Sequence, residues 1–586
     1  MARLKYNFTW KKYHRWLGLV LSVFMLVFCV SGIILNHREV FSDCEVSRKW
    51  LPASYHIKNF NNGVVKGTVV KNSGSLAISE GFSDSILVYG CAGVFLTDYQ
   101  LSTWQDFNAA LPKSIDERNV RHLVQARDGS LWCAALRDVY RYDENAQQWK
   151  KVELPGNEER IMDVALGKNS IQVVALTRSR IFEITPIASN IDVSESPSSL
   201  ASSAKGGVSE KSPDIFEKKS GGFSEKVGTF LGKYRVEAKI IPAPKNYEPK
   251  TTLFKLVWHL HSGEFFGLPG KLVVDAIALV LIVLSITGIL LFILPYGIRR
   301  AKKLAAKARM KRLGKQFAWN MKWHNKIGYV TIVLTLWIAI TGMCLRPPLM
   351  VPLVLSKLPQ AVGEDGNVWQ DKLRAIRWDA VQGDWLVSTS EGFLRVDEDF
   401  SQAPKMLPDD ECPKLSPMGV TVWESDGKGG WIVGSFRGIY RWNPVNHSLN
   451  QILDYFTGKP SEETSMIPIS DNLVCGYSED FLGGKPLVFD FAKGVEDAKG
   501  QAVALCNDEP KTSRNEESMS DLICETAPMS LWNVALELHV GRCYSPFLGP
   551  LSDLFVFLSG LLITLVLLSG YIISHRRRKK AQARLK

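Results

Sequence analysis

The chain has 586 residues, of which 46% are apolar, and a formal net charge of +12 at pH 7. This length can support two or more domains. The positive charge lies in three stretches that contain no Asp or Glu, residues 1–15, 299–322 and 576–586, so the rest of the chain is net acidic. Because each basic stretch flanks an apolar run, it indicates the cytoplasmic side of membrane spans and argues against a nucleic-acid partner.

The first apolar run, residues 13–37, is long enough to cross a bilayer as a helix and has a histidine near each end, His14 and His37. A signal peptide is the competing interpretation of a basic start before an apolar core. The core is too long for that, and no A-x-A-type cleavage site follows it. We therefore expect a membrane span.

A second run, residues 323–346, aligns with the first without a gap. His14 matches His324, and Ser31-Gly32 matches Thr341-Gly342. At about 100° per residue, Gly32 returns to the helix face of His14. Each helix is therefore expected to carry one stripe with an imidazole and small residues that admit a bulky, flat partner.

Two further spans, residues 271–296 and 551–575, also resemble each other, together with the segments that lead into them. His261 matches His539, and Asp275 matches Asp553 at the same distance from its histidine. The sequence thus predicts a helical four-span bundle formed by duplication of a two-span unit. Each unit contains one large insert.

The two inserts, residues 38–188 and 347–537, are expected to be all-β. Short strands recur at a spacing of roughly forty residues, the period of a propeller blade. We count about three units in each insert, residues 466–491 being the weakest. Either the two inserts close into one β-propeller, or each forms a plain β-sandwich.

The remaining segments follow from these boundaries. Both termini and the 297–322 segment are expected in the cytoplasm, and both inserts in the periplasm of a bacterium whose inner membrane holds the spans. The expected segments are a cytoplasmic tail (1–12), a linker and approach (189–250), an interfacial pre-helix (251–270), a basic cytoplasmic loop (297–322), an interfacial segment (538–550) and a basic cytoplasmic tail (576–586).

Eight of the ten cysteines fall on the oxidising side, where disulfides persist. Cys91 and Cys133 occupy similar places in neighbouring repeats and are the most plausible pair, although sequence alone does not determine connectivity. The chain contains no C-x-x-C-H motif, so covalent c-type haem is not indicated.

Six of the ten histidines lie at span ends, with His259 close by; His14, His324 and His575 are expected inside, and His37, His261 and His539 outside. One interpretation is that they are polar residues at the level of the lipid headgroups. The other is metal binding. The Glu-x-x-His motif of di-iron bundles and the closely spaced Cys/His sets of structural zinc are absent from the spans.

Two histidines on facing helices, beside glycines, suit a haem that is bound through two imidazoles without covalent links. The repeat predicts that His14 and His324 ligate one haem b, and that His261 and His539 ligate a second. His37 and His575 are second-tier candidates that replace one ligand, shuttle protons or have no role.

Two features near these histidines have open interpretations. Asp275 and Asp553 either hydrogen-bond an imidazole or relay protons, or they are acids stabilised at helix N-termini. The repeated Ser-Gly and Thr-Gly pairs serve either helix packing or haem clearance; they are Ser31-Gly32, Thr287-Gly288, Thr341-Gly342 and Ser569-Gly570.

The H-R-W-L-G motif before the first span and L-H-S-G-E-F-F-G-L-P-G-K-L-V-V-D before the second resemble the PepSY-associated transmembrane family. This family includes iron-regulated membrane proteins and ferric-siderophore reductases of bacterial inner membranes. The resemblance covers the four spans and their approaches. It implies a four-helix module with haem b, with His14, His261, His324 and His539 as ligand candidates. No PepSY α/β domain is evident in either insert.

The cytoplasmic segments are too short for a flavin or nicotinamide domain. Electrons are therefore expected from a partner protein or a membrane quinol, and the acceptor, a ferric chelate or siderophore by resemblance, is expected on the periplasmic face. The competing hypothesis is a non-redox sensor or binding protein that is anchored in the lipid by the same spans. A proton-coupled transporter using Asp275 and Asp553 is disfavoured, because the spans lack interrupted midplane segments.

Overall fold

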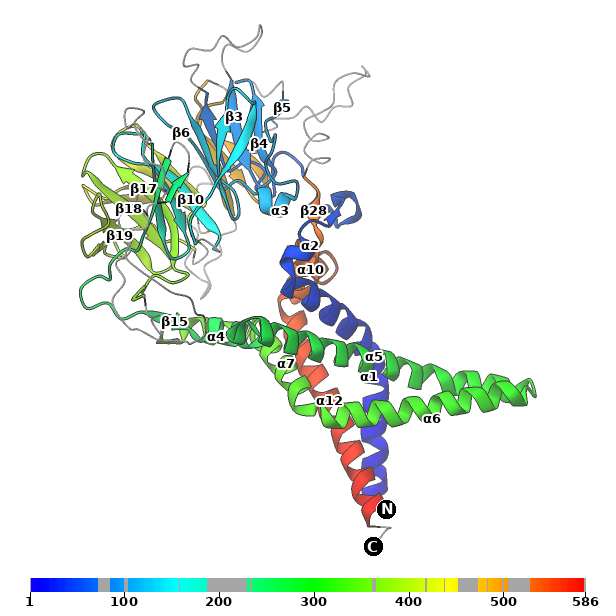
Figure 1. Ribbon diagram of the computed structural model, residues 1–586. Helices are drawn as coiled ribbons and strands as arrows, with labels where there is room; N and C mark the ends of the chain where they lie inside the picture. Colours follow the sequence, from blue (N-terminus) through cyan, green and yellow to red (C-terminus); the bar gives the residue numbers. More distant parts are fainter. Residues whose placement is uncertain are drawn as a thin grey trace, which may run out of the picture.

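The fold is taken from a computed structural model. It describes residues 2–71, 85–99, 104–156, 159–186, 229–231, 234–360, 365–416, 419–436, 438–451, 473–481, 483–497, 500–503 and 527–583. Five long or apolar helices form one part of the molecule, and small antiparallel sheets form the other (Figure 1).

The five helices are α1 (Ala2–Asn36), α5 (Gly267–Lys303), α6 (Lys307–Val330), α7 (Ile332–Cys344) and α12 (Ser552–Gln582). Helix α1 packs against α5 and α12, α5 packs against α6, and α7 packs against α12. Among the described residues, three helices are long and apolar enough to cross a membrane, or four if α6 and α7 count as one span.

The expected third span is not a straight helix. Helices α6 and α7 meet at Thr331 with a bend of 68°. The Thr331 hydroxyl donates to the carbonyl of Ile327, and the Thr335 hydroxyl donates to that of Thr331. Hydroxyls that bond to the carbonyl four residues earlier bend helices. The periodicity of 323–346 predicted helical structure but not this break, so the expectation of an uninterrupted third span is wrong.

The expected basic loop 297–322 is mostly helical. It forms the last turns of α5 and the first part of α6, with a short turn at residues 304–306. In Figure 1 this hairpin and the α1–α12 pair extend in different directions from the place where the helices cross, and the two chain termini lie together at the end of α1 and α12. A cytoplasmic position for all three basic segments stays a prediction.

Within the described residues, the β-rich part contains six small sheets, three from each insert, besides two two-stranded ribbons. Sheet 1 holds β2 (Gly67–Val70), β3 (Ile86–Gly90), β4 (Gly93–Thr97) and β5 (Trp104–Asp106). Sheet 2 holds β6 (His122–Gln125), β7 (Leu131–Ala134), β8 (Val139–Asp143) and β9 (Gln148–Val152). Sheet 3 holds β10 (Ile161–Leu166), β11 (Val173–Thr177), β12 (Ile181–Pro186), β14 (Tyr234–Lys239) and β13 (Thr229–Leu231), in that spatial order.

The second insert supplies the other three sheets. Sheet 4 holds β17 (Leu373–Asp379), β18 (Asp384–Thr389), β19 (Gly392–Val396) and β20 (Lys405–Met406). Sheet 5 holds β21 (Val422–Ser425), β22 (Trp431–Ser435), β23 (Gly438–Asn443) and β24 (Ser448–Gln451). Sheet 6 holds β25 (Val474–Ser478), β26 (Leu487–Asp490) and β27 (Gly494–Asp497). All neighbouring strands are antiparallel, and five of the sequence repeats correspond to the hairpins β3–β4, β7–β8, β11–β12, β18–β19 and β22–β23.

Neighbouring sheets share buried apolar clusters across both inserts. Clusters lie between sheets 1 and 2, 2 and 3, 3 and 4, 4 and 5, and 5 and 6. A further cluster contains Phe95 of sheet 1 and Phe489 of sheet 6. Because the inserts meet at two of these interfaces, they pack as one body, called the β domain below. This argues against a separate sandwich in each half.

Two short ribbons connect the β domain to the helices. Strand β1 (Glu45–Val46) pairs with β28 (Met529–Ser530), and β15 (Lys250–Thr252) pairs with β16 (Lys357–Pro359). Strand β28 leads into α10 (Leu531–His539), and β15 leads into α4 (Leu253–Ser262). The side chains of Ser530 and Thr252 cap these two helices by accepting backbone N–H bonds.

The observed strands and helices correct two predicted boundaries. The described end of the expected linker 189–250 contributes strands β13 and β14 to sheet 3 and β15 to a ribbon. The end of the expected β insert 347–537 is the start of helix α10. In both places the strand or helix is completed by a partner that is distant in sequence, so the local pattern is a weak guide.

The predicted disulfide between Cys91 and Cys133 is wrong. All eight cysteines within the described residues are free thiols. Cys133 is buried in the cluster between sheets 1 and 2, whereas Cys91 packs against the cluster that joins sheets 1 and 6. Similar positions in successive sheets therefore face different interfaces. Cys506 and Cys524 lie outside the described residues.

Candidate functional site

Four helices bring four histidines together in two pairs. His14 of α1 lies beside His324 of α6, with their ring centroids 6.3 Å apart. His261 of α4 lies beside His539 of α10, with their ring centroids 6.2 Å apart. We call these the inner pair and the outer pair. They are the same pairs that the sequence repeat indicated; their function as ligands stays a prediction.

The separation of the rings suits one metal ion between two imidazoles. An imidazole nitrogen binds a metal ion at about 2 Å, so two rings on opposite sides of the ion have centroids roughly 6 Å apart. Among the described residues, no group of three or more His, Cys, Asp or Glu side chains could hold a bare metal ion. A centre with only two protein ligands matches haem, because the porphyrin supplies the other four.

Each histidine uses its Nδ1 atom to contact a hydroxyl on another helix. The contacts are His14 with Ser569 at 2.9 Å, His324 with Thr287 at 2.8 Å, His261 with Thr341 at 3.0 Å, and His539 with Ser31 at 2.9 Å. In His14 and His539, Nδ1 also lies 3.1 Å from the carbonyl oxygens of Val566 and Phe28. In all four rings, Nε2 is therefore the nitrogen left for a metal.

The outer pair is uncharged at neutral pH. Burial, together with the neighbouring His539, lowers the pKa of His261 to about 3. Burial lowers the pKa of His539 to about 4. Neutral imidazole is the form that binds a metal ion, so both rings are in the required state.

The other span-end histidines have different neighbours. His37 Nε2 lies 2.7 Å from the Asp275 carboxylate, which also accepts a bond from Asn36. His575 stacks on Tyr571 and Tyr329, and His259 packs edge-on against Trp258. These three residues thus lie in local contacts of their own, outside the two facing pairs.

Asp275 contacts an imidazole, as one interpretation of the sequence allowed, but the ring is that of His37 and not of a paired histidine. Asp553 lies 3.3 Å from the guanidinium of Arg346. Asn36 and Arg346 occupy matching positions in the first and third spans. Each aspartate therefore ties the start of one span to the end of another.

The sequence predicted that the Ser-Gly and Thr-Gly pairs lie near the histidines but did not show which pair contacts which histidine. Each hydroxyl serves a histidine from a different helix, and Ser31 serves His539 although it lies on the helix of His14. The sequence did mark these pairs as candidates, because each pair recurs at matching positions of the repeat. The choice of partner depends on helix packing.

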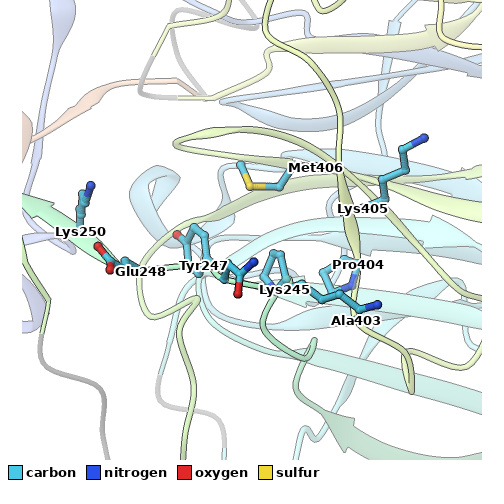
Figure 2. A pocket seen from close by; sticks show the side chains of 10 residues that line it. Lys245, Tyr247, Glu248, Lys250, Ala403, Pro404, Lys405 and Met406 are labelled. Carbon is cyan, nitrogen blue, oxygen red and sulfur yellow. The ribbon is translucent and has the colours of Figure 1, made fainter.

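In the β domain, a cavity of about 550 Å³ lies between residues 244–250 and residues 403–406. Three lysines line it, and Figure 2 shows Lys250 and Lys405 at opposite ends of the opening. Tyr247, which also lines the cavity, stacks on Trp369 and accepts a bond from Lys372. The cavity is basic and large enough for a small ligand.

Together, the apolar helices, the facing histidine pairs and the β domain define a helical membrane protein with two candidate metal centres. The chain belongs to the family of the PepSY-associated TM region, whose sequence model matches residues 3–295 and again residues 292–578. No curated protein matches the chain.

Two solved structures show a weak likeness to the chain. Both are the extracellular domain of BT4673 from B. thetaiotaomicron, described in one case as a one-component system and in the other as a hybrid two-component system. Each is 8% identical, with a TM-score of 0.28, and the alignment covers 75% of this chain and 39% of that chain. At this level, neither structure bears on the fold or the function of the chain.

Proposed function

We propose that the protein is a di-haem b oxidoreductase that moves electrons across the bacterial inner membrane to a periplasmic acceptor. The observation that carries this proposal is that two imidazoles lie beside each other at each of two separate places in the helical part, with ring centroids 6.3 Å and 6.2 Å apart. Ser31, which contacts the outer pair, lies seventeen residues along α1 from His14 of the inner pair. At about 1.5 Å per residue, the two pairs are separated by most of the thickness of a bilayer.

In this proposal the chain holds two haems and controls their surroundings. Each haem would supply reversible one-electron chemistry at its iron. His14 and His324 would bind the inner haem, and His261 and His539 the outer haem, each through Nε2. The surrounding helices would limit the access of water to the inner haem, which would lower the local dielectric constant.

The proposed orientation of the protein in the membrane rests on the distribution of its charged residues. The basic termini and the basic α5–α6 hairpin belong in the cytoplasm, and the net acidic β domain belongs in the periplasm. The four spans form two copies of one unit, a view that the two successive family matches support. The electron donor is a membrane quinol or a partner protein. The acceptor is a ferric chelate, which takes up one electron per iron and becomes ferrous.

We further propose that the six sheets form one six-bladed propeller. Besides the shared apolar clusters, a polar contact supports every junction around the ring. These contacts are Lys66 with Val120, His122 with Asp163, Asp163 with Arg377, Arg377 with Trp423, Thr421 with Val474, and Ser478 with Thr68.

The optical spectrum of the purified protein in detergent tests the redox proposal. We expect a reducible Soret band and about two haems per chain. Changing both His14 and His324 to Ala should remove one haem, and changing both His261 and His539 to Ala should remove the other. His575→Ala is the matched control, because it removes a span-end histidine outside both pairs. A colourless wild-type protein with an intact fold would exclude the proposal.

A second candidate function is a membrane-anchored binding protein or sensor. The basic cavity between residues 244–250 and 403–406 favours it. In that case the chain would bind a small anionic ligand in the β domain and contain no haem. Calorimetric titration with anionic ferric chelates, compared between the wild-type protein and Lys250→Ala, would detect such binding whether or not haem is present.

A further inference from the structure

We propose that each of the four Ser-Gly or Thr-Gly pairs is a positioning element for one histidine, which fixes the tautomer of the ring and its distance from the helix. We call such a pair a seat. The seats are Ser31-Gly32, Thr287-Gly288, Thr341-Gly342 and Ser569-Gly570. The inference rests on the proposed haem function, because it assigns what prepares the histidines to bind metal.

The hydroxyl of each seat can act only as an acceptor toward the histidine. Its single hydrogen is already donated to a backbone carbonyl of its own helix; the bonds are Ser31 to Val27 at 2.7 Å, Thr287 to Val283 at 2.7 Å, Thr341 to Trp337 at 2.8 Å and Ser569 to Val566 at 2.8 Å. The hydroxyl oxygen therefore accepts from Nδ1–H. This arrangement leaves the lone pair of Nε2 free at all four histidines before any metal is bound.

The glycine of each seat lies under the Cε1 edge of the same ring. A Cβ atom placed on Gly342 would lie 2.8 Å from His261 Cε1, one on Gly570 2.9 Å from His14 Cε1, and one on Gly32 3.3 Å from His539 Cε1. At Gly288 the distance to His324 Cε1 would be 3.7 Å, an ordinary contact. At Gly342 and Gly570 a Cβ atom would therefore displace the ring, at Gly32 the contact would be tight, and at Gly288 there is space for a methyl group.

The seats connect the helices in a defined pattern. Histidines of α1, α6, α4 and α10 rest on seats of α12, α5, α7 and α1, respectively. Helix α1 therefore supplies a ligand to the inner pair and a seat to the outer pair. This arrangement allows a specific test. Ser31 lies on the same helix as His14, a ligand candidate for the inner haem, but a change of Ser31 should affect the outer haem.

The experiment compares Ser31→Ala and Thr341→Ala with Thr287→Ala and Ser569→Ala in the full-length protein. Loss of a hydrogen-bond partner behind a metal-bound imidazole typically lowers metal affinity about 10–100-fold. We expect the first two variants to weaken binding of the outer haem and raise its midpoint potential, because its ligand becomes less basic. The inner haem should be unchanged. Thr287→Ala and Ser569→Ala should instead weaken binding of the inner haem and raise its midpoint potential, and leave the outer haem unchanged.

Two further pairs of variants separate positioning from folding. Thr341→Ser and Ser31→Thr retain the hydroxyl and should restore wild-type potentials and low-spin electron paramagnetic resonance signals. Gly342→Ala should displace His261 and disturb the outer haem, whereas Gly288→Ala, where the added methyl group has space, should disturb the inner haem less.

Three outcomes would overturn the inference while leaving the haem proposal intact. They are a Ser31→Ala effect on the inner haem alone, unchanged potentials and haem content in all four alanine variants, and equal effects of Gly342→Ala and Gly288→Ala. A wild-type protein that contains no haem would instead overturn the proposed function.

Discussion

The inner and outer histidine pairs use the same contacts but depend on different parts of the protein. Both inner histidines lie within long helices, α1 and α6, that pack against other long helices. Both outer histidines lie on short helices, α4 and α10, that continue directly from ribbons of the β domain. The comparison indicates that the inner pair is positioned by the helical bundle alone, whereas the outer pair also depends on the β domain.

Two aspartates of the β domain make this dependence concrete. Asp116 accepts bonds from Ser530, the cap of α10, and from Asn533 in the first turn of that helix. Asp371 lies 2.8 Å from Lys255, the corresponding residue of α4. Each outer helix is thus attached at its start to an aspartate of the β domain. A change in the β domain therefore reaches the outer pair through these two contacts.

The largest loss of stability is expected from Arg377→Ala. Arg377 contacts Asp163 of sheet 3, His122 of sheet 2 and the Trp423 carbonyl of sheet 5. Removing one partner of a buried ion pair costs about 3–5 kcal/mol. Thermal unfolding followed by tryptophan fluorescence and the Soret band should show a less stable β domain and earlier loss of the outer haem, with the inner haem retained.

Arg395→Ala is the matched control for Arg377→Ala. Arg395 binds Asp379 and Asp384, both within its own sheet, so its loss should destabilise the β domain less. Simultaneous loss of both haems in Arg377→Ala would contradict the distinction between the two pairs.

Acid should weaken the same contacts between sheets, those of Asp163 with Arg377 and His122. Burial opposes ionisation of Asp163, but Arg377 and His122 outweigh it and hold its pKa below the ordinary value of 3.8. Because the folded-state pKa is lowered, the stabilisation is present above pH 4 and is lost as the pH falls below that value. The melting temperature of the β domain should fall less on acidification in Asp163→Asn than in the wild-type protein.

A smaller effect, confined to the start of α10 and the outer pair, is expected from Asp116→Ala. Its buried carboxylate serves Ser530 and Asn533, and leaving such groups without a partner costs about 1–3 kcal/mol. Haem titration should show weaker binding at the outer pair and no change at the inner pair. Asp371→Ala should act in the same direction but more weakly, because the side chain of Asp371 is more exposed. Asp143→Ala, which removes a surface contact with Lys150, is the control.

The smallest effect is expected from His37→Ala. The His37–Asp275 contact is partly exposed, and such pairs contribute about 0.2–1 kcal/mol. Haem content and both midpoint potentials should remain at wild-type values. If the variant lost a haem, the assignment of the outer pair to His261 and His539 would have to be revised.

The β hairpins and the histidine pairs could be predicted for a shared reason, which is that each is encoded within a short stretch or its repeat. The hairpin β22–β23 is visible in W-I-V-G-S-F-R-G-I-Y-R-W-N, and the match of His14 with His324 needs only an alignment. The break at Thr331 was not predictable from periodicity. Threonine occurs in straight and in bent apolar helices, and the sequence does not show whether its hydroxyl will bend the helix. The free thiols of Cys91 and Cys133 depend on which sheet faces which, and local pattern does not encode that.

The sequence by itself determined the apolar spans, the family, the repeated strands and the identity of the four histidines, because periodicity, charge and internal repetition are properties of neighbouring residues. Only the tertiary structure decided that Ser31 serves His539 and not His14, that sheets 1 and 6 share a core, and that the outer histidines are attached to the β domain through Asp116 and Asp371. These contacts join residues that are more than a hundred positions apart. They exist because each element must bury its apolar face against another, and the whole set of elements determines which faces meet.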